Sequence, residues 1–316
     1  MSASAVAFLM RLLLLSACLI PFAACADDGG ATPRVDRPPF PGDQAYALLL
    51  EQVAFGPRVP GQPGHERQLA WMKEWLEGRA DTVIEQAFPQ QTTRGETLQL
   101  TNLFARFNPR EQQRVLLVAH WDTRPRADQS RNAADREQPV PGANDGASGT
   151  AVLLVLAELF RQQPPPIGVD LLFVDGEDYG PETTDMFFGA RYFGANQPAG
   201  YPPLYGVLVD MVGDSDLRLP REGYSQERAP EVVDRVWRVA RELGYGGVFV
   251  DSPGGYVTDD HVALNDAGIR TIDIIDFNYG PGNGYWHTLQ DVPENTSAES
   301  LDVVGEVLAE LIYRGG

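Results

Sequence analysis

Apolar and polar positions along the chain predict helices and strands that alternate from residue 44 onwards. Two amphipathic helices are expected at 44–53 and 66–76, with a turn-rich segment between them. Strand and helix signals then follow one another to the end of the sequence. The expected strands are 82–88, 97–107, 113–119, 169–175, 204–210 and 271–275, and the expected later helices are 148–162, 229–243 and one that begins near 297.

Strand 113–119 has the pattern of a strand that is covered on both faces of a sheet. After Arg114 it is wholly apolar as far as Ala119. Thr296 and Glu299 are the expected capping pair of the last helix. Strands that alternate with helices predict one α/β domain with a central, mostly parallel mixed sheet and helices on both faces. The sequence shows no internal repeat and no boundary of a second domain.

The segment 121–144 interrupts the alternation. It is polar, rich in Arg and Asp, and has neither helical nor strand periodicity. Loops of this length are uncommon in compact domains unless they are functional or disordered. This loop lies directly between two of the candidate site residues described below.

The first 25 residues have the pattern of a secretory signal. Arg11 precedes an apolar run at 12–22, which is shorter than the roughly 20 residues that a membrane-spanning helix needs. The sequence FAAC that ends at Cys25 resembles a bacterial lipoprotein processing site. We therefore expect an exported protein, periplasmic or at the cell surface, with a lipid anchor at Cys25. The alternative is a soluble exported protein that is cleaved nearby.

Residues 26–42 are rich in Asp, Gly and Pro and are expected to form a flexible tether, followed by a catalytic domain at 43–316. The chain has two cysteines, and Cys18 is lost with the signal, so no pair remains for a disulfide. The net charge of −19 argues against nucleic-acid binding and leaves the lipid anchor as the expected contact with a membrane. A negative protein favours cationic groups such as the N-terminal amine of a peptide.

Acidic residues and histidines cluster where strands are expected to end, and open α/β sheets bind their ligands beyond those carboxyl ends. Two further candidates, Asp145 and His287, are expected in loops rather than at the end of a strand. The candidates are His120 and Asp122 after strand 113–119, Glu177 and Asp178 after strand 169–175, Asp210 at the end of strand 204–210, Asp145 within the glycine-rich segment 142–149, and His287 after strand 271–275.

These residue types suit a zinc ion, which imidazole nitrogen and carboxylate oxygen bind at about 2.0–2.2 Å. The spacing of His120 and Asp122 allows the acid to orient the imidazole. Glycines around Asp145 allow a tight turn that aims its carboxylate inward. Glu177 and Asp178 can have different roles, one as a metal ligand and the other as a base. Because neighbouring strand residues point to opposite faces, this division requires that the chain has left the strand.

Each candidate also has an ordinary structural interpretation. An acid at a strand end is more often a helix cap or a solvated loop residue, and a lone histidine is usually structural. The chain has only four histidines, however, and two of them fall among these acids. The order of the motifs along the chain, rather than any one of them, favours a metal site.

In this order the motifs resemble those of the zinc aminopeptidase and glutaminyl cyclase superfamily, most closely its bacterial glutaminyl-peptide cyclotransferase-like branch. The resemblance covers the chain from about residue 42 and implies the three-layer fold of the zinc aminopeptidases. The stretches that carry it are AHWDTRP (119–125), GANDGASG (142–149), DGEDYG (175–180), LVDMVGD (208–214), GGYVTDDH (254–261), TIDIID (271–276) and WHTLQD (286–291).

The resemblance also implies a role for each metal ligand. The cyclases bind one zinc through residues that match Asp145, Asp178 and His287. The two-zinc aminopeptidase relatives add partners that match His120 and Asp210, with Asp145 bridging the ions. The resemblance thus implies one zinc ion in a cyclase and two in an aminopeptidase.

The same resemblance implies the catalytic and substrate-binding residues. Glu177 matches the general acid/base of both groups, and Asp210 and Asp259 match cyclase acids in a hydrogen-bonded network near that base. We expect Asp122 to contact the metal ligands and orient them without binding the metal itself. The residues expected to contact substrate are Trp286, Phe187, Asp260 and His261.

Two positions depart from the pattern. Asp178 stands where many relatives carry Glu, so the backbone must approach the metal more closely. The cyclases also carry a tryptophan in the loop that follows, whereas residues 181–188 contain none. Only Phe187 or Phe188 is available there to form the pocket wall.

The expected reaction is cyclisation of the N-terminal glutaminyl residue of a peptide or protein to pyroglutamate, with loss of ammonia. The alternative is hydrolysis of an N-terminal residue by a two-zinc aminopeptidase. The pair Asp259-Asp260 followed by His261, together with Trp286 next to His287, favours the cyclase through the resemblance. A non-catalytic binding module is disfavoured because the ligands and the base are all present.

Overall fold

The computed structural model describes residues 36–316. The expected signal sequence, the expected lipidation site Cys25 and the first part of the expected tether lie outside the described residues. Among residues 36–316, no helix combines the length and apolar character needed to cross a membrane.

The last residues of the expected tether pack against the final helix. Arg37 Nη2 lies 2.6 Å from a carboxylate oxygen of Glu306, and its Nε lies 2.8 Å from one of Glu310. Phe40 is buried, and its backbone N–H donates to Glu306. The folded part of the chain therefore begins several residues before the expected boundary at 43, because two buried carboxylates hold this segment in place.

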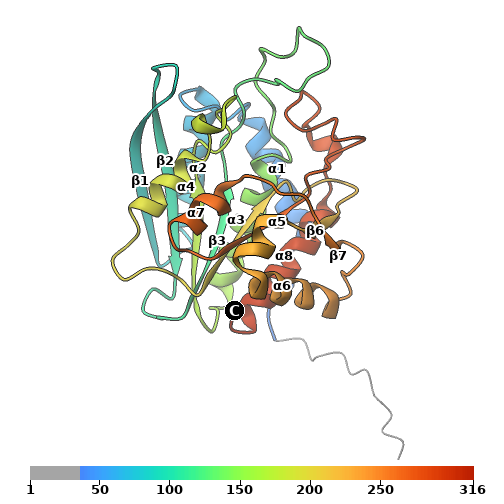
Figure 1. Ribbon diagram of the computed structural model, residues 1–316. Coiled ribbons are helices and arrows are strands. Elements are labelled where there is room, and N and C mark those ends of the chain that lie inside the picture. The colour runs from blue at the N-terminus through green and yellow to red at the C-terminus, as the bar shows by residue number, and fades with distance from the viewer. Residues whose placement is uncertain (1–35) are drawn as a thin grey trace, which may run out of the picture. The chain divides into compact units, whose positions relative to one another are not determined.

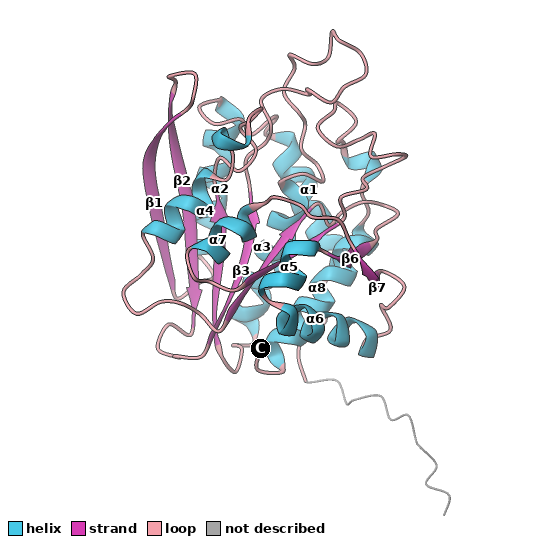
Figure 2. Ribbon diagram, in the orientation of Figure 1, coloured by secondary structure: helices cyan, strands magenta, loops and turns pink. Residues whose placement is uncertain are grey.

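Helices and strands alternate through most of the described chain (Figures 1 and 2). The helices are α1 (Gly42–Ala54), α2 (Pro63–Glu77), α3 (Ala147–Gln162), α4 (Phe188–Ala195), α5 (Gly223–Arg228), α6 (Pro230–Glu242), α7 (Asp260–Asp266) and α8 (Ala298–Tyr313), with short 3-10 turns η1 (Thr183–Asp185) and η2 (Pro293–Asn295). The strands are β1 (Thr82–Gln91), β2 (Thr97–Phe107), β3 (Arg114–His120), β4 (Gly168–Val174), β5 (Tyr205–Asp210), β6 (Leu219–Arg221), β7 (Phe249–Pro253) and β8 (Thr271–Ile275).

The central sheet has the strand order β1-β2-β4-β3-β5-β8. Strands β4, β3, β5 and β8 are parallel, whereas β1 and β2 form an antiparallel hairpin whose second strand pairs with β4. The expected mixed, mostly parallel sheet is confirmed. Because the four parallel strands end at the same edge, the residues that follow them converge there.

Helices cover both faces of the sheet, as expected for a three-layer fold. On strand β3, Val115, Leu117 and Ala119 belong to the larger core, which also contains side chains of α1, α3, α6 and α8. Leu116 and Val118 face the other way and pack with residues of α4 and α7. The alternation along a strand thus buries β3 on both faces, which explains its continuous apolar sequence.

Two features of the fold differ from expectation. The N-cap of α8 is Ser297, whose hydroxyl accepts the backbone N–H of Ser300 at 3.1 Å, so the expected capping pair of Thr296 and Glu299 is wrong by one position. Ser297 takes the cap because it has the extended backbone that a cap requires. The short elements α4, α5, α7, β6 and β7 were not expected, since few residues carry their periodicity.

Candidate metal and catalytic site

The candidate site lies at the carboxyl edge of the parallel strands. His120 is the last residue of β3, and Asp210 is the last residue of β5. Strand β4 ends at Val174, so Glu177 and Asp178 follow in a loop. The site is completed by the segments before α3 and before η2, which contribute Asp145 and His287.

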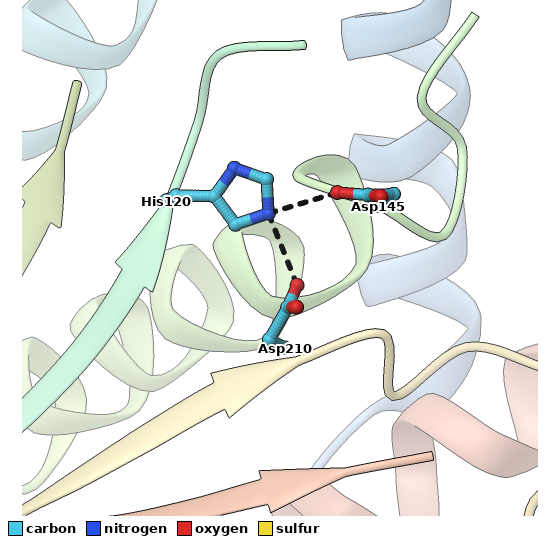
Figure 3. Close-up of side chains that lie close together, drawn as sticks. All are labelled: His120, Asp145 and Asp210. Carbon is cyan, nitrogen blue, oxygen red and sulfur yellow. Dashed lines mark hydrogen bonds and ion pairs between the residues drawn. The ribbon is translucent and has the colours of Figure 1, made fainter. Parts of the chain in front are cut away.

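One ring nitrogen of His120 faces the carboxylates of both Asp145 and Asp210 (Figure 3). Its Nε2 atom is 3.1 Å from Oδ1 of Asp145 and 3.0 Å from Oδ1 of Asp210. All three side chains are buried and lie close enough together to share one cation. The structure therefore brings together the three residues expected to hold a second metal ion.

A second group of three is formed by Asp145, Asp178 and His287. His287 Nε2 lies 3.5 Å from Oδ2 of Asp145 and 3.3 Å from Oδ1 of Asp178. The two oxygens of Asp145 thus face different histidines, Oδ1 toward His120 and Oδ2 toward His287. This is the arrangement that a carboxylate between two metal positions requires.

The turn that carries Asp145 is fixed from several sides. Gly146 has φ +96°, and a Cβ atom there would lie 2.5 Å from the carbonyl oxygen of Asp122. The carboxylate of Asp291 accepts the backbone N–H groups of Asn144 and Asp145 at 2.7 and 3.2 Å. Glycine is therefore required next to Asp145, as expected, and the carboxylate of Asp291 holds the backbone of the turn that precedes α3.

Arg58 fixes the chain just before this turn. Its guanidinium is fully buried and donates to the carbonyl oxygens of Pro141 and Gly142. Neither Arg58 nor Asp291 was assigned a role from the sequence, although Asp291 ends the stretch WHTLQD and Arg58 lies in the turn-rich segment between the first two helices. Their role appears only when residues distant in sequence come together.

Asp122 contacts three of the candidate site residues, Glu177, Asp178 and His120. Its two oxygens accept the backbone N–H groups of Glu177 and Asp178 at 3.1 and 3.2 Å. Oδ1 also lies 3.6 Å from Nδ1 of His120, on the side of the ring away from the metal position. This is the supporting position expected for Asp122, and it shows that the chain has left the strand at Glu177.

Glu177 lies beside His120, on the same side of the ring as Asp122. Its side chain is buried, and Oε2 lies 3.7 Å from Nδ1 of His120. Burial raises the pKa of Glu177 well above its usual value; His120 opposes this, while the charges of Asp178, Asp259 and Asp260 add to it. A carboxyl group with a raised pKa can accept and return a proton near neutral pH.

Asp210, Asp259 and Asp260 are further acids around His120 and Glu177. Asp259 is the N-cap of α7, and burial together with the charge of Asp210 raises its pKa to about 7. Burial also raises the pKa of Asp260. Asp210 is hydrogen-bonded to His120 at 3.0 Å, and the charges of Asp259 and Asp260 both raise the pKa of Glu177.

Three residues expected at the substrate have other contacts. His261 is fully buried, with its ring 3.2 Å from Glu222 and 3.8 Å from Asp273, so it faces the interior rather than an open pocket. Phe187 is buried and holds Glu177 through its backbone, donating its N–H to the Glu177 carbonyl at 2.8 Å. The alternative wall residue, Phe188, belongs to a small apolar core beside β1 and β2.

Trp286 lies against a metal-ligand candidate as expected. Its ring stacks on that of His287 with 3.8 Å between the centroids, and Phe277 packs edge-on against it with 5.0 Å between the centroids. Trp286 is only partly buried, so part of the indole that stacks on His287 remains accessible. It can therefore form an apolar wall for a small group bound there.

The donor set fits a zinc ion. Burial alone would lower the pKa of His287, but the carboxylates of Asp178 and Asp145 raise it to about 9, which shows how strongly negative this position is. Within residues 36–316, Oδ2 of Asp178 is buried without a hydrogen-bond partner. Oxygen and imidazole donors in a buried, negative position are what zinc sites provide.

Comparison with known proteins agrees with this geometry. The model of peptidase family M28 matches residues 102–312. The chain is 37% identical to a glutaminyl cyclase of Bacteroides thetaiotaomicron solved with N-acetylhistamine, with a TM-score of 0.85, and the match covers 89% of this chain and 100% of the other. A structure described as a leucine aminopeptidase precursor from the same species matches with the same identity, coverage and TM-score.

A bovine glutaminyl-peptide cyclotransferase is 25% identical over 305 residues, which cover 83% of this chain and 77% of that protein. The fold, the order of the ligands and the family match agree with the resemblance found in the sequence. The protein belongs to peptidase family M28.

Proposed function

We propose that the protein cyclises N-terminal glutaminyl residues of peptides to pyroglutamate and releases ammonia. The observation that carries the proposal is the stacking of the partly exposed Trp286 on the metal-ligand candidate His287, which supports an apolar wall beside the proposed zinc. Such a wall suits a short side chain that folds back on its own amine. The similarity to solved bacterial glutaminyl cyclases over nearly the whole described chain supports the same reaction.

Membership of the family implies zinc, and we propose one ion held by Asp145, Asp178 and His287. When bound there, zinc supplies Lewis-acid polarisation of the substrate's side-chain amide carbonyl. His120 and Asp210 then form a hydrogen-bonded pair, 3.0 Å apart, that supports Asp145. The buried acids around this position also favour the cationic end of a peptide.

Glu177 is the proposed proton carrier. The neutral α-amine attacks the carbon of the side-chain amide, a nitrogen–carbon bond forms, and Glu177 accepts the proton that the amine releases. The bond between that carbon and the amide nitrogen then breaks, and Glu177 returns the proton to the departing ammonia. Burial and the charges of Asp178, Asp259 and Asp260 raise the pKa of Glu177, which enables the carboxyl group to hold the proton between the two steps.

A second candidate is hydrolysis of the N-terminal peptide bond by a two-zinc aminopeptidase. The observation that favours it is the position of Asp145 between two complete groups of three ligands. A solved relative described as a leucine aminopeptidase precursor supports it equally. In that reaction Glu177 would take its proton from a water molecule instead of an amine.

The zinc content and a change of the base test the proposal. Glu177→Gln removes the proton acceptor and leaves the three ligands in place, so we expect bound zinc and no release of ammonia from a glutaminyl peptide. Glu182→Gln, an exposed position in the following loop, is the matched control and should keep full activity. Retained activity in Glu177→Gln would refute the assigned base, and two zinc ions per chain would favour the peptidase.

A further inference from the structure

The loop at 121–146 places an arginine–carboxylate pair against the candidate zinc ligands. Arg124 is almost fully buried, and its Nη1 lies 2.5 Å from Oδ1 of Asp178. Nε and Nη2 of the same guanidinium donate to the two oxygens of Asp128 at 3.0 and 2.8 Å. One arginine thus binds a metal-ligand candidate on one side and a carboxylate in a two-bond fork on the other.

Asp128 faces the second ligand of the same group. Its Oδ1 lies 3.8 Å from Nδ1 of His287, whose Nε2 points toward Asp145 and Asp178. The following residue, Gln129, donates its backbone N–H to the carbonyl of His287 at 3.2 Å. His287 has φ +52°, a left-handed conformation that a non-glycine residue needs its surroundings to maintain. The Asp128 segment therefore contacts both the ring and the backbone of this ligand.

The fold leaves a space shaped for this guanidinium. Gly180 has φ +50°, and a Cβ atom there would lie 2.7 Å from Nη1 of Arg124. The backbone of Arg124 is fixed as well, since Val140 donates its N–H to the Arg124 carbonyl at 3.0 Å. The side chain is thus held from both ends inside the loop.

We propose that Arg124 and Asp128 are positioning residues that hold Asp178 and His287 in the geometry in which these two side chains bind zinc. Arg124 holds Oδ1 of Asp178, the same oxygen that lies 3.3 Å from Nε2 of His287, so the arginine fixes the carboxylate in the orientation in which it faces this histidine. Among the described residues Oδ2 has no hydrogen-bond partner. Asp178 is one methylene shorter than glutamate, and the arginine fixes the orientation of this short side chain. Oδ1 of Asp128 lies 3.8 Å from the ring nitrogen of His287 that turns away from the metal position. This is the side from which carboxylates support histidine ligands in zinc sites, although the distance here is longer than a hydrogen bond.

If Arg124 acted only through its charge, it would weaken zinc binding rather than support it. A guanidinium next to a zinc position repels the ion, so an arginine that only neutralised Asp178 would weaken zinc binding, and its removal would tighten it. A positioning arginine has the reverse consequence, because its removal leaves Asp178 free to turn away. The sign of the change in zinc affinity therefore separates the two roles.

The proposal rests on the zinc site proposed above, whichever of the two reactions that site performs. The test measures the zinc dissociation constant of the full chain by competition with a chelator. Arg124→Met and Asp128→Asn should each weaken zinc binding by about 10- to 100-fold, the usual effect of losing a supporting partner. Arg124→Lys keeps the charge but not the fork and should show a smaller loss in the same direction.

Arg131→Met is the matched control, since Arg131 is an exposed arginine of the same loop, and it should leave zinc affinity unchanged. Unchanged or tighter zinc binding in Arg124→Met would overturn the proposal. If Arg124→Met does not fold, Asp128→Asn and Arg124→Lys decide it on the same scale, and wild-type affinity in both overturns it. The visible spectrum of the cobalt-substituted protein gives a second readout: it should shift in Asp128→Asn and stay unchanged in Arg131→Met.

If the proposed reaction is wrong, the expected zinc affinities do not change. The proposal about the reaction and the proposal about Arg124 and Asp128 can therefore be refuted independently. If the protein proves to be an aminopeptidase, zinc binding by Asp145, Asp178 and His287 still depends on Arg124 and Asp128. If zinc affinity proves independent of both residues, the products formed from a glutaminyl peptide still decide the reaction.

Discussion

The carboxylate of Asp122 accepts a hydrogen bond from the backbone N–H group of Glu177, with 3.1 Å between Oδ1 and nitrogen. Its other oxygen accepts the N–H of Asp178 at 3.2 Å. One side chain from the end of β3 thus fixes the turn that presents both the base and a metal ligand. The spacing of His120 and Asp122 in the sequence therefore serves the neighbouring strand as well as the histidine.

We predict that Asp122→Asn lowers kcat by about 10- to 100-fold and weakens zinc binding. The amide retains one acceptor oxygen, but its NH2 group faces a backbone N–H that has lost its partner. Steady-state kinetics and chelator competition measure both effects. Wild-type kcat with wild-type zinc affinity would show that the turn holds its shape without this carboxylate.

Trp286 should act mainly on substrate binding. Trp286→Ala removes the indole that stacks on His287 and should raise KM by at least 10-fold, whereas Trp286→Phe keeps an aromatic surface and should have a smaller effect. Kinetics on a short glutaminyl peptide separate the two variants. Equal KM values in Trp286→Ala and the wild type would place the substrate elsewhere.

Asp276 should make the stability of the protein depend on pH. Burial raises the pKa of Asp276 to about 6, although the backbone N–H groups of Arg218 and Asn278 oppose the shift. The folded protein therefore binds this proton more tightly than the unfolded chain does. The associated stability is present below about pH 4 and is lost as the pH rises through about 6.

Between low and neutral pH the wild type should lose about 1 kcal/mol more of its free energy of unfolding than Asp276→Asn does. This figure allows for partial screening of the charge by solvent. Urea unfolding of the zinc-free wild type and variant at pH 4.5 and pH 7 gives the difference. The variant should lose less stability than the wild type between these values. Equal losses would show that Asp276 titrates alike in the folded and unfolded chain.

The proposed lipid anchor can be tested without reference to the fold. We propose that Cys25 is lipidated, because it follows the apolar run and two alanines as in a lipoprotein processing site. Cys25→Ser should abolish incorporation of a labelled fatty acid in a bacterial host, and Cys18→Ser should leave it intact. Label retained in Cys25→Ser, or none in the wild type, would refute the anchor.

The parts of the fold that could be predicted are those with a strong local signal. Strands β2 and β8 have the expected bounds, because residues 97–107 and 271–275 carry a clear strand pattern between turn residues. Helices α5 and α7 have six and seven residues, too few for a readable period, and they are held by contacts with the rest of the domain. The N-cap of α8 differed because several neighbouring residues are able to cap a helix.

The candidate site also contains residues that could be predicted from the sequence and residues that could not. The ligand candidates could be found because their order along the chain follows the ends of the strands. The residues that hold those ligands could not, because Arg124, Asp128 and Arg58 lie in segments without periodicity, and Asp291 acts on a turn 146 residues earlier in the sequence. Arginine and aspartate are common in solvated loops, so only the contacts that these residues make in the folded chain distinguish them.

The central claim is the reaction, and its products test it most directly. The mature protein with bound zinc is incubated separately with a glutaminyl peptide and with a leucyl peptide of otherwise identical sequence, and ammonia and free amino acid are measured in each. The account predicts ammonia and a pyroglutamyl peptide from the first and no product from the second. Free glutamine or leucine without ammonia would contradict it and establish the aminopeptidase.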